Sequence, residues 1–474
     1  MLTLSVDTLL QVTGGTVLAG SAGTMVNGLA IDSRQVQPGT VFVAFAGEQV
    51  DGHAFIGQAL ADGARAVLVT RDDETVREAF AAAERGESVL VRVADAREAV
   101  EALGRYHRER LMCRVIGVTG STGKTTTKDF LRSVLATRMR VVATAENRNN
   151  ELGVPLTVME AGADTEVLVV EMAMRGPGQI AHLCSISRPT DGLVTNVGVS
   201  HVEILGTEEA IASAKGELVR AIPASGMVFL NGDDAWTDTL GGFAVGPVTR
   251  YGLSEEADVR AEDISIDEDG TPSFTLVTAR GSAEVHLPVP GRHNVYNALA
   301  AASVGLYLGL TPEDVVSGLE SATFSKWRME TFQSATGITI INDAYNANPT
   351  SMQAALSALA DVPTRGRRIA VLGDMAELGS LAELAHFQLG ELVPALAVDV
   401  LVTVGERARR IAEGAVAAGM VPDSVRPCVA AAEASEVLDD LVAAGDTVLV
   451  KASRVMGLER VVEGMIEPRV QPSA

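Results

Sequence analysis

The chain has 474 residues, and its 61 acidic residues outnumber its 38 lysines and arginines, which gives a formal net charge of −23. A chain of this length exceeds what one hydrophobic core usually supports, so about two to four domains are expected. With 47% apolar and 21% charged residues, the composition is that of a folded globular protein and excludes a largely disordered or fibrous chain.

Cysteine usage and charge distribution exclude further classes. Cys113, Cys184 and Cys428 have no CxxC or Cys/His spacing, so neither a disulfide framework nor a structural zinc site is expected, and a cytoplasmic location fits. The N-terminus lacks a basic segment and no stretch approaches about 18 uninterrupted apolar residues, so neither secretion nor membrane spanning is expected. No Lys/Arg run is present, which argues against a nucleic-acid partner.

The first segment, residues 1–97, is predicted to be a small α/β domain. It contains two short apolar runs, TVFVAF and ARAVLVT, together with Gly-rich turns.

Residues 98–324 are predicted to form a central α/β domain. The apolar run CRVIGVTG is followed by STGKTTTKDFLRSVLATR, whose apolar residues recur at helical spacing, so a strand, a loop and a helix are predicted. The runs EVLVVEMAM, GLVTNVG and MVFLNGD alternate with helix-like stretches such as TEEAIASAKGELVRAI, which favours a largely parallel sheet. Residues 251–290 are turn-rich and alternating, which predicts an antiparallel β insert.

A second alternating pattern begins near Trp327, where ITIIND, RRIAVLGDM, VDVLVTVG and DTVLVKAS are separated by Ala-rich helical stretches. It predicts a separate Rossmann-like domain over residues 325–474. The predicted fold class is therefore α/β with three domains.

The strongest chemical signal is GVTGSTGKTTT, Gly117 to Thr127, between a predicted strand and a predicted helix. Glycines let backbone amides wrap phosphate oxygens, Lys124 adds a positive charge and the Thr125 hydroxyl can bind Mg²⁺. The strict Walker pattern is missed because Val118 replaces its first glycine. The alternative is a Gly-rich turn with a solvated lysine, but the order of strand, glycines, lysine and hydroxyl favours phosphate binding. The predicted nucleotide ligands here are Gly120, Ser121, Thr122, Gly123, Lys124, Thr125 and Thr126.

Lysine is rare in this chain. Only Lys124, Lys128, Lys215, Lys326 and Lys451 occur, beside 33 arginines (38 minus 5). A site that needs a compact or deprotonable amine would keep a lysine where arginine is the default cation. GC-rich codon usage would produce the same preference for arginine. The presence of a lysine is therefore only weak evidence of a functional site.

Seven ordered motifs across nearly the whole chain resemble those of the Mur ligases. They are the loop GxxGxxGKTxT, NRNNELGVPLT from Asn147, EMAMRGPGQI from Glu171, TNVGVSHVEILG from Thr195, AKGEL from Ala214, GRHNVYNALAA from Gly291 and NDAYNANPTSM from Asn342. Within the family, DAYNANP together with LGDMAELG from Leu372 is similar to the members that add D-alanyl-D-alanine. The DNPR signature of the members that add diaminopimelate is absent.

The resemblance implies a monomeric, cytoplasmic ligase of peptidoglycan precursor synthesis that uses ATP and two Mg²⁺ ions. It would join D-alanyl-D-alanine to a UDP-N-acetylmuramoyl-tripeptide. Because a carboxylate is a poor electrophile, the ATP γ-phosphoryl would first move onto the tripeptide carboxylate, and the dipeptide amine would then attack the acyl phosphate. In such phosphoryl transfer the protein supplies mainly alignment and charge neutralisation.

The resemblance also assigns roles around the phosphates. The implied catalytic residues are Lys124, His201, Lys215 and Arg328. The implied metal ligands are Thr125, Glu171, His201 and, if it is carbamylated, Lys215. Carbamylation would turn the amine into a carboxylate-like group, whereas an ammonium beside two metal ions would be repelled. Taken alone, Glu171 is more often a solvated strand-end acid and His201 an ordinary loop histidine. The alternative for Lys215 is a solvated lysine paired with Glu217.

Further nucleotide contacts are implied on both sides of residue 325. His293, Asn294 and Asn297 resemble adenine-side contacts, since amide groups both donate and accept at the purine edge. The alternative for Asn294 is a helix cap. Arg328 is expected to bind phosphate, and Asp343 is expected to bind the ribose. Because both lie in the predicted C-terminal domain, the ATP site would be complete only when the domains close.

Two substrate sites are implied near the ends of the chain. The uridine diphosphate pocket would use residues of IDSRQVQPGTVFVAFAGEQVDGHAFI, a stretch that taken alone is more often a surface loop. Near the C-terminus, KASR is expected to bind the dipeptide carboxylate, with a helix N-cap by Ser453 and solvated cations as the alternative. The implied substrate ligands are Ser33, Arg34, Asp51, Gly52, His53, Asn150, Lys451, Ser453 and Arg454.

Two positions depart from the family pattern. Glu146 stands where a glycine often precedes the NxNN stretch, which puts tripeptide contacts in doubt, and Ala173 takes the glycine place in EMG, with little expected effect.

Two other functions are kept as alternatives. One is another Mur-like amide ligase of the folylpolyglutamate or cyanophycin synthetase type, although the DSR and DGHAF stretches argue against folate. The other is a P-loop ATPase that works as a switch or binding module. The choice of lysine or diaminopimelate in the tripeptide is not determined by the sequence.

Overall fold

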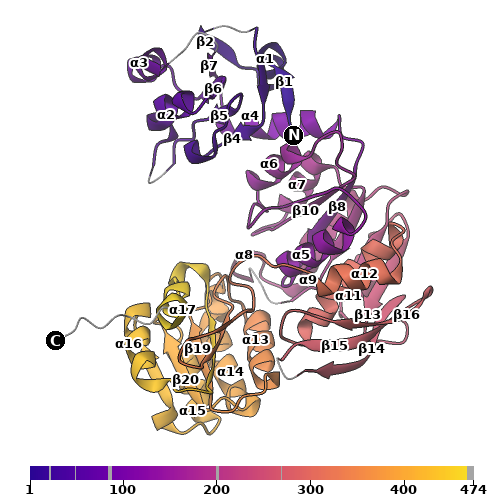
Figure 1. The fold of residues 1–474 in the computed structure, drawn as a ribbon, viewed down its shortest axis with the longest axis vertical. Helices are drawn as coiled ribbons and strands as arrows, with labels where there is room; N and C mark the ends of the chain where they lie inside the picture. The colour runs from indigo at the N-terminus through magenta and orange to yellow at the C-terminus, as the bar shows by residue number, and fades with distance from the viewer. Residues whose placement is uncertain (21–22, 48–49, 84–87, 199–201, 268–269, 467–474) are drawn as a thin grey trace, which may run out of the picture. The chain divides into compact units, whose positions relative to one another are not determined.

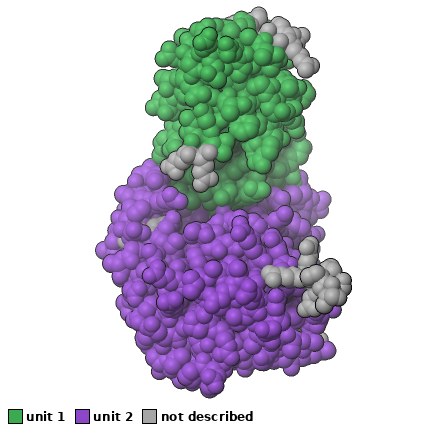
Figure 2. Space-filling model, turned by 90° about the vertical axis from the view of Figure 1, so that its left-hand side faces the viewer, with its two compact units in different colours: residues 1–117, 139–173, 180–191 green, residues 118–138, 174–179, 192–474 purple. Residues whose placement is uncertain are grey.

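The structure is a computed structural model that describes residues 1–20, 23–47, 50–83, 88–198, 202–267 and 270–466 (Figure 1). The chain divides into two compact units, which Figure 2 colours separately. Unit 1 comprises residues 1–117, 139–173 and 180–191, and unit 2 comprises residues 118–138, 174–179 and 192–474. The boundaries of the three predicted domains differ from this division and stay predictions.

The first part of unit 1 is a small α/β region, as predicted. Its helices and strands are β1 (Thr3–Ser5), α1 (Val6–Thr13), β2 (Thr16–Gly20), β3 (Met25–Asn27), β4 (Leu29–Ala30), β5 (Val41–Val43), α2 (Ile56–Ala61), β6 (Ala66–Val69), α3 (Glu74–Ala83), β7 (Val89–Arg92) and α4 (Ala96–Arg108). One sheet has the order β2-β7-β6-β5-β4, in which β4 to β7 are parallel and β2 is antiparallel. β5 and β6 are wholly apolar because a parallel sheet is buried on both faces.

The rest of unit 1 comprises further strands and helices. These elements are β8 (Arg114–Thr119), which crosses the unit boundary, β9 (Val141–Ala143), α6 (Gly153–Glu160), β10 (Val167–Glu171) and α7 (Gln179–Ser187). β9 and β10 are parallel, and β10 is completely buried.

Unit 2 continues with the helix after the loop and a second run of strands. They are α5 (Lys124–Ala136), β11 (Asp191–Val194), α8 (Val202–Leu205), α9 (Glu208–Ala221), β12 (Val228–Asn231), α10 (Thr237–Gly241), β13 (Val248–Gly252), β14 (Val259–Ile266), β15 (Pro272–Thr278), β16 (Gly281–His286), α11 (His293–Tyr307) and α12 (Pro312–Glu320). β11 to β14 are parallel, whereas β14, β15 and β16 are antiparallel. The antiparallel prediction for residues 251–290 is confirmed, and these strands extend the parallel sheet because β14 pairs with β13.

The C-terminal part of unit 2 forms a separate six-stranded sheet. Its elements are β17 (Glu330–Gln333), β18 (Thr339–Asn342), α13 (Pro349–Asp361), β19 (Arg368–Gly373), α14 (Ala382–Leu392), β20 (Val400–Val404), α15 (Arg409–Ala417), β21 (Val425–Cys428), α16 (Ala431–Leu441), β22 (Thr447–Lys451) and α17 (Glu459–Ile466). The strand order is β17-β18-β22-β19-β20-β21, and only β17 is antiparallel. In Figure 1, α13 lies on one side of β19, and α16 and α17 lie on the other. This arrangement of helices on a parallel sheet confirms the predicted α/β class.

No helix in the described ranges is both long and apolar enough to cross a bilayer.

Candidate active site

Two positions in the loop before α5 have no room for a side chain and therefore require glycine. Gly120 has a φ of 153°, and a Cβ there would lie 1.8 Å from Thr195 Oγ1. Gly123 has a φ of 77°, and a Cβ there would lie 2.4 Å from Asn297 Oδ1. A side chain at either position would push the loop away from its supports. Because α5 begins at Lys124, the unpaired amides of its first turn lie at this loop, which is the arrangement that binds phosphate.

The segment after β11 holds this loop in place. Thr195 Oγ1 donates to the Thr122 carbonyl at 2.6 Å, and Asn196 Oδ1 accepts from the Thr122 amide at 3.0 Å. Ser121 Oγ donates to the Gly198 carbonyl at 2.8 Å and accepts from the Gly198 amide at 2.9 Å. Thr195 and Asn196 were not among the predicted site residues, although the TNVG motif that contains them was a signal for the family.

A buried lysine lies in the same unit. Lys215 on α9 is 1% exposed. Burial, and then the neighbouring Lys124 ammonium, lower the pKa of Lys215 well below its ordinary value, while Asp234 acts in the opposite sense. The Lys124 ammonium itself donates to the Gly120 carbonyl at 2.7 Å. Lys215 is therefore no solvated surface lysine, and its amine is readily deprotonated.

Arg328 reaches the glycine-rich loop from the linker between α12 and β17. Its Nη2 donates to Thr125 Oγ1 at 3.2 Å, and its guanidinium lies over the Tyr345 ring at 3.9 Å from the centroid. Its Nε is buried and has no hydrogen-bond partner among the residues that the structure describes. The structure thus brings together Lys124, Thr125 and Arg328, three of the predicted phosphate-side residues.

The predicted adenine-side residues are engaged inside the protein. Asn297 Oδ1 accepts from Thr127 Oγ1 at 3.1 Å, and Asn297 Nδ2 donates to Asn294 Oδ1 at 2.8 Å. Asn294 Nδ2 in turn donates to the Pro290 carbonyl at 2.8 Å. Since α11 begins at His293, Asn294 lies within the first turn and does not cap the helix. These contacts tie α11 to α5, and the adenine assignment stays a prediction.

His293 has an unusual environment for a histidine. Burial lowers the pKa of His293 to about 4, with Asp343 acting against that effect and Lys451 adding to it. The imidazole is therefore neutral at neutral pH.

Glu171 and its supports belong to unit 1. This residue ends β10 and is buried; its Oε1 accepts from Asn149 Nδ2 at 2.8 Å, and its amide donates to Thr144 Oγ1 at 2.9 Å. Asn149, which positions the carboxylate, was missed although it lies in the NRNNELG motif. Its neighbour Asn150 accepts from the Gly153 amide at 2.9 Å at the start of α6.

His201 lies outside the described residues. Within the described part of the chain, no three or more His, Cys, Asp or Glu side chains are grouped to hold a metal ion.

The predicted uridine diphosphate ligands form local contacts in unit 1. Arg34 is exposed and pairs with Asp32 at 2.6 Å. His53 is buried, with Nδ1 2.6 Å from Asp51 Oδ1, and Asp51 also pairs with Arg71 at 2.8 Å. A Cβ on Gly52, between them, would lie 2.8 Å from the backbone of Phe45. Ser33, at the start of a 3-10 turn (Ser33–Gln35), is half-buried.

The three residues predicted to bind the dipeptide carboxylate all have partners within unit 2. Lys451 is 3% exposed, and its Nζ donates to Asp343 Oδ2 at 2.5 Å. Ser453 Oγ accepts from the Ala376 amide at 2.8 Å. Arg454 pairs with Glu459 at 2.7 Å.

Sequence-family comparison identifies all three parts of the chain. Residues 25–108 match "Mur ligase family, catalytic domain", residues 118–305 match "Mur ligase middle domain" and residues 327–454 match "Mur ligase, glutamate ligase domain". The chain belongs to the Mur ligase family.

Similar Mur ligases cover nearly the whole chain. The UDP-N-acetylmuramoyl-tripeptide–D-alanyl-D-alanine ligase of Bacillus subtilis is 36% identical, with 94% of each chain covered. A crystal structure of MurF from Acinetobacter baumannii superposes with a TM-score of 0.85 at 32% identity, covering 98% of this chain and 99% of that one. The MurF ligase of Thermotoga maritima in complex with ADP gives a TM-score of 0.76 at 28% identity, covering 92% and 96%. The three-domain Mur ligase fold predicted from the motifs is confirmed.

One departure from the Mur ligase pattern has a backbone explanation. Glu146 has a φ of 47°, in the left-handed region that glycine adopts without steric cost. A glycine at this position is therefore favoured by conformation, whereas Glu146 holds the same turn under strain. Ala173, at the other departure, has no such φ, and its amide donates to the Asn149 carbonyl at 2.9 Å.

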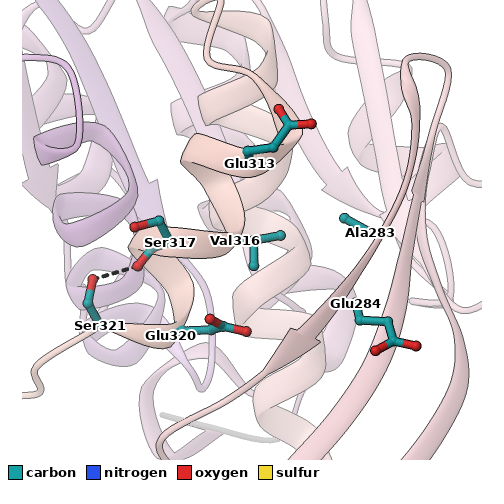
Figure 3. A pocket seen from close by; sticks show the side chains of 7 residues that line it. All are labelled: Ala283, Glu284, Glu313, Val316, Ser317, Glu320 and Ser321. Atoms are coloured by element: carbon teal, nitrogen blue, oxygen red, sulfur yellow. Dashed lines mark hydrogen bonds between the residues drawn. The ribbon is translucent and has the colours of Figure 1, made fainter.

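A surface pocket lies between β16 and α12 (Figure 3). It has a volume of about 520 Å³, and three of its seven lining residues are glutamates: Glu284, Glu313 and Glu320. None of the predicted site residues lines it, and three carboxylates are unsuited to bind a nucleotide or a UDP-linked precursor.

Proposed function

We propose that this Mur ligase joins D-alanyl-D-alanine to a UDP-N-acetylmuramoyl-tripeptide with hydrolysis of ATP to ADP and phosphate. The single observation that carries the proposal is that Arg328 reaches Thr125, next to Lys124 in the first turn of α5, in a chain similar over nearly its whole length to ligases with this name. This arrangement is suited to phosphoryl transfer, in which aligned cations and amides neutralise charge.

The chain's own residues would act in two steps. In the first, the α5 amides, Lys124 and Arg328 hold the ATP phosphates in line with the tripeptide carboxylate, which attacks the γ-phosphorus and releases ADP. In the second, the unprotonated dipeptide amine attacks the carbonyl of the acyl phosphate, the bond from that carbonyl to the phosphate oxygen breaks, and phosphate leaves while the proton from the amine passes to it or to solvent. The acyl phosphate reacts with the amine far more readily than a free carboxylate does, because phosphate is a far better leaving group than oxide.

Two Mg²⁺ ions are part of the proposal. In unit 2, the Thr125 hydroxyl is an oxygen donor of the kind that Mg²⁺ prefers, and a carbamylated Lys215 would add another. In unit 1, the buried Glu171 carboxylate is a donor of the same kind. When bound, Mg²⁺ supplies positive charge to the phosphate oxygens.

Carbamylation of Lys215 is supported by its surroundings. Only an unprotonated amine reacts with CO₂, forming the N–C bond of a carbamate and releasing one proton. The burial of Lys215 and the charge of Lys124 favour that unprotonated amine. Carbamylation would also replace the repulsion between the two ammonium groups by attraction.

Lys215→Ala tests the modification. The variant is expected to lose activity and to regain part of it with millimolar formate or acetate, which replace the carbamate oxygens. Activity that does not fall on substitution, or never returns with any short carboxylate, contradicts the carbamate.

The ligase activity is tested by product formation. The protein is incubated with ATP, Mg²⁺, D-alanyl-D-alanine and a UDP-tripeptide that ends in lysine or in diaminopimelate, and the pentapeptide is sought by mass. ADP release is followed in parallel. ATP turnover that is indifferent to both substrates would instead support a P-loop ATPase switch, and product from glutamate and a folate would support the folylpolyglutamate type.

A further inference from the structure

The segment that carries Arg328 has a strained backbone. Its two neighbours, Trp327 and Met329, have φ values of 61° and 51°, and both carry large side chains. Left-handed conformations are unfavourable for residues with a Cβ, so two of them on either side of one arginine persist only where surrounding contacts enforce them.

Those contacts come first from the C-terminal part of unit 2. The Met329 amide donates to Asp343 Oδ1 at 3.2 Å, while Lys451 Nζ donates to Asp343 Oδ2 at 2.5 Å. Both oxygens of this buried carboxylate are thus engaged, one by the linker and one by the lysine. Lys451 also donates to the Asn346 carbonyl at 2.9 Å, which fixes the loop after β18.

A second contact holds the other side of Arg328. The Arg454 guanidinium lies over the Trp327 ring, 4.1 Å from its centroid, and pairs with Glu459 at 2.7 Å. Lys451 and Arg454 therefore hold the two left-handed residues from one short loop, KASR.

The linker is also fixed to α5, the helix after the glycine-rich loop. The Ser325 amide donates to Asp129 Oδ2 at 2.8 Å, and Asp129 pairs with buried Lys128 at 2.9 Å. With both ends held, the guanidinium of Arg328 meets Thr125 Oγ1.

We propose that Lys451, acting through Asp343, and Arg454, acting through Trp327, are positioning residues that hold the strained linker so that Arg328 points at the nucleotide phosphates. This inference rests on the proposed ligase function. It gives Lys451 and Arg454 another role than the predicted binding of the dipeptide carboxylate, because Lys451 is buried against Asp343 and Arg454 pairs with Glu459.

The experiment separates positioning from dipeptide binding by kinetics. Lys451→Met is expected to lower kcat at least about tenfold while the KM for D-alanyl-D-alanine changes less than about twofold, because a misplaced phosphate ligand slows the chemistry. A dipeptide ligand would instead raise that KM with kcat largely unchanged. Lys326→Met is the matched control, since Lys326 is an exposed lysine on the same linker.

A double-mutant cycle identifies Arg328 as the group through which the lysine acts. In an Arg328→Ala background, Lys451→Met is expected to lower kcat by less than about twofold more, since the residue it positions is already gone. An undiminished tenfold loss in that background overturns the proposal, because a merely structural defect would be additive.

Arg454→Lys provides a variant that does not bury an unpaired charge. It keeps a cation for Glu459 but loses the planar stack on Trp327. We expect a smaller fall in kcat that also vanishes in the Arg328→Ala background, and a fall that persists there contradicts the proposal. If the wild-type protein forms no pentapeptide at all, the proposed function fails, whereas an active wild type with additive variants overturns only the positioning roles.

Discussion

Lys124 and Lys451 both lie near the carboxyl end of a buried strand, yet the fold gives them different surroundings. Lys124 is partly exposed at the start of α5 and donates to the Gly120 and Ser121 carbonyls of its own loop. Lys451, at the end of β22, is buried and donates to the Asp343 carboxylate. A lysine near the end of a strand is therefore not by itself an anion site, since its partners decide whether its charge is available to a ligand.

The largest effect is expected from Lys124→Met. Removing the ammonium from the phosphate site should lower kcat by at least about 10³, because charge neutralisation is the main contribution of the protein to phosphoryl transfer. ADP release in the presence of both substrates measures it. Lys326→Met serves as the control. If the Lys124 variant is as active as this control, Lys124 does not bind phosphate and its proposed difference from Lys451 is wrong.

Two glycine-to-alanine substitutions test how tightly the glycine-rich loop and the segment after KASR are packed. Gly120→Ala places a Cβ within contact of Thr195 Oγ1 and should cost about 2–3 kcal/mol of stability together with ATP affinity. Gly457→Ala, three residues after KASR, has a φ of 64° and places its Cβ more than 4 Å from every atom of the described part of the chain beyond its two neighbours, so only about 1 kcal/mol of backbone strain is expected. Urea unfolding and nucleotide titration compare the two variants. Equal losses of unfolding free energy and ATP affinity would mean that the short distance between position 120 and Thr195 does not affect stability or binding.

The pH dependence of stability tests the surroundings of Lys451. His293 is neutral in the folded protein, with its pKa lowered to about 4, whereas an unfolded histidine titrates near pH 6.5. The unfolded chain thus binds the extra proton, so stability is complete above about pH 6.5 and falls as the pH drops toward 4.

In His293→Gln this contribution should be absent, so that wild type loses about 1–2 kcal/mol more than the variant between pH 7 and pH 5. Urea midpoints at several pH values measure the difference. His107 and His386, whose pKa values burial also lowers, are present in both proteins and cancel. Parallel pH profiles would show instead that His293 has the same pKa in the folded and the unfolded protein.

The smallest effect is expected from Ser453→Ala. Loss of the hydrogen bond to the Ala376 amide should lower stability by about 1 kcal/mol and leave the KM for D-alanyl-D-alanine unchanged. A raised KM for D-alanyl-D-alanine with unchanged stability would support Ser453 as a dipeptide ligand. The KASR segment would then bind a ligand, as the glycine-rich loop is proposed to do.

Most of the architecture could be predicted from the sequence because it depends on local patterns. The apolar runs that became β8, β10, β11, β12, β18, β19, β20 and β22 are each four to six residues long and buried. The glycine-rich loop was also recognisable, since the order of strand, glycines and lysine is local. Short elements such as β1 and β4 were missed because two or three residues give little periodicity.

The site was less predictable where a side chain depends on distant partners. Asn149 and Thr195 support the predicted ligands across 22 and 73 residues of sequence, and no local pattern indicates such contacts. The left-handed conformation of Glu146 explains a family glycine that the sequence alone could only note as a departure.

By itself, the sequence determined the α/β class, the ordered motifs and the phosphate-binding loop, because strand and helix periodicity and the chemistry of a glycine-lysine loop are encoded in neighbouring residues. Only the tertiary structure decided that Lys215 is buried beside a second cation, that Arg328 reaches Thr125 and that Lys451 is engaged by Asp343. Pairs such as Asp343 and Lys451 are 108 residues apart, and burial and charge pairing are properties of what the fold places around a side chain.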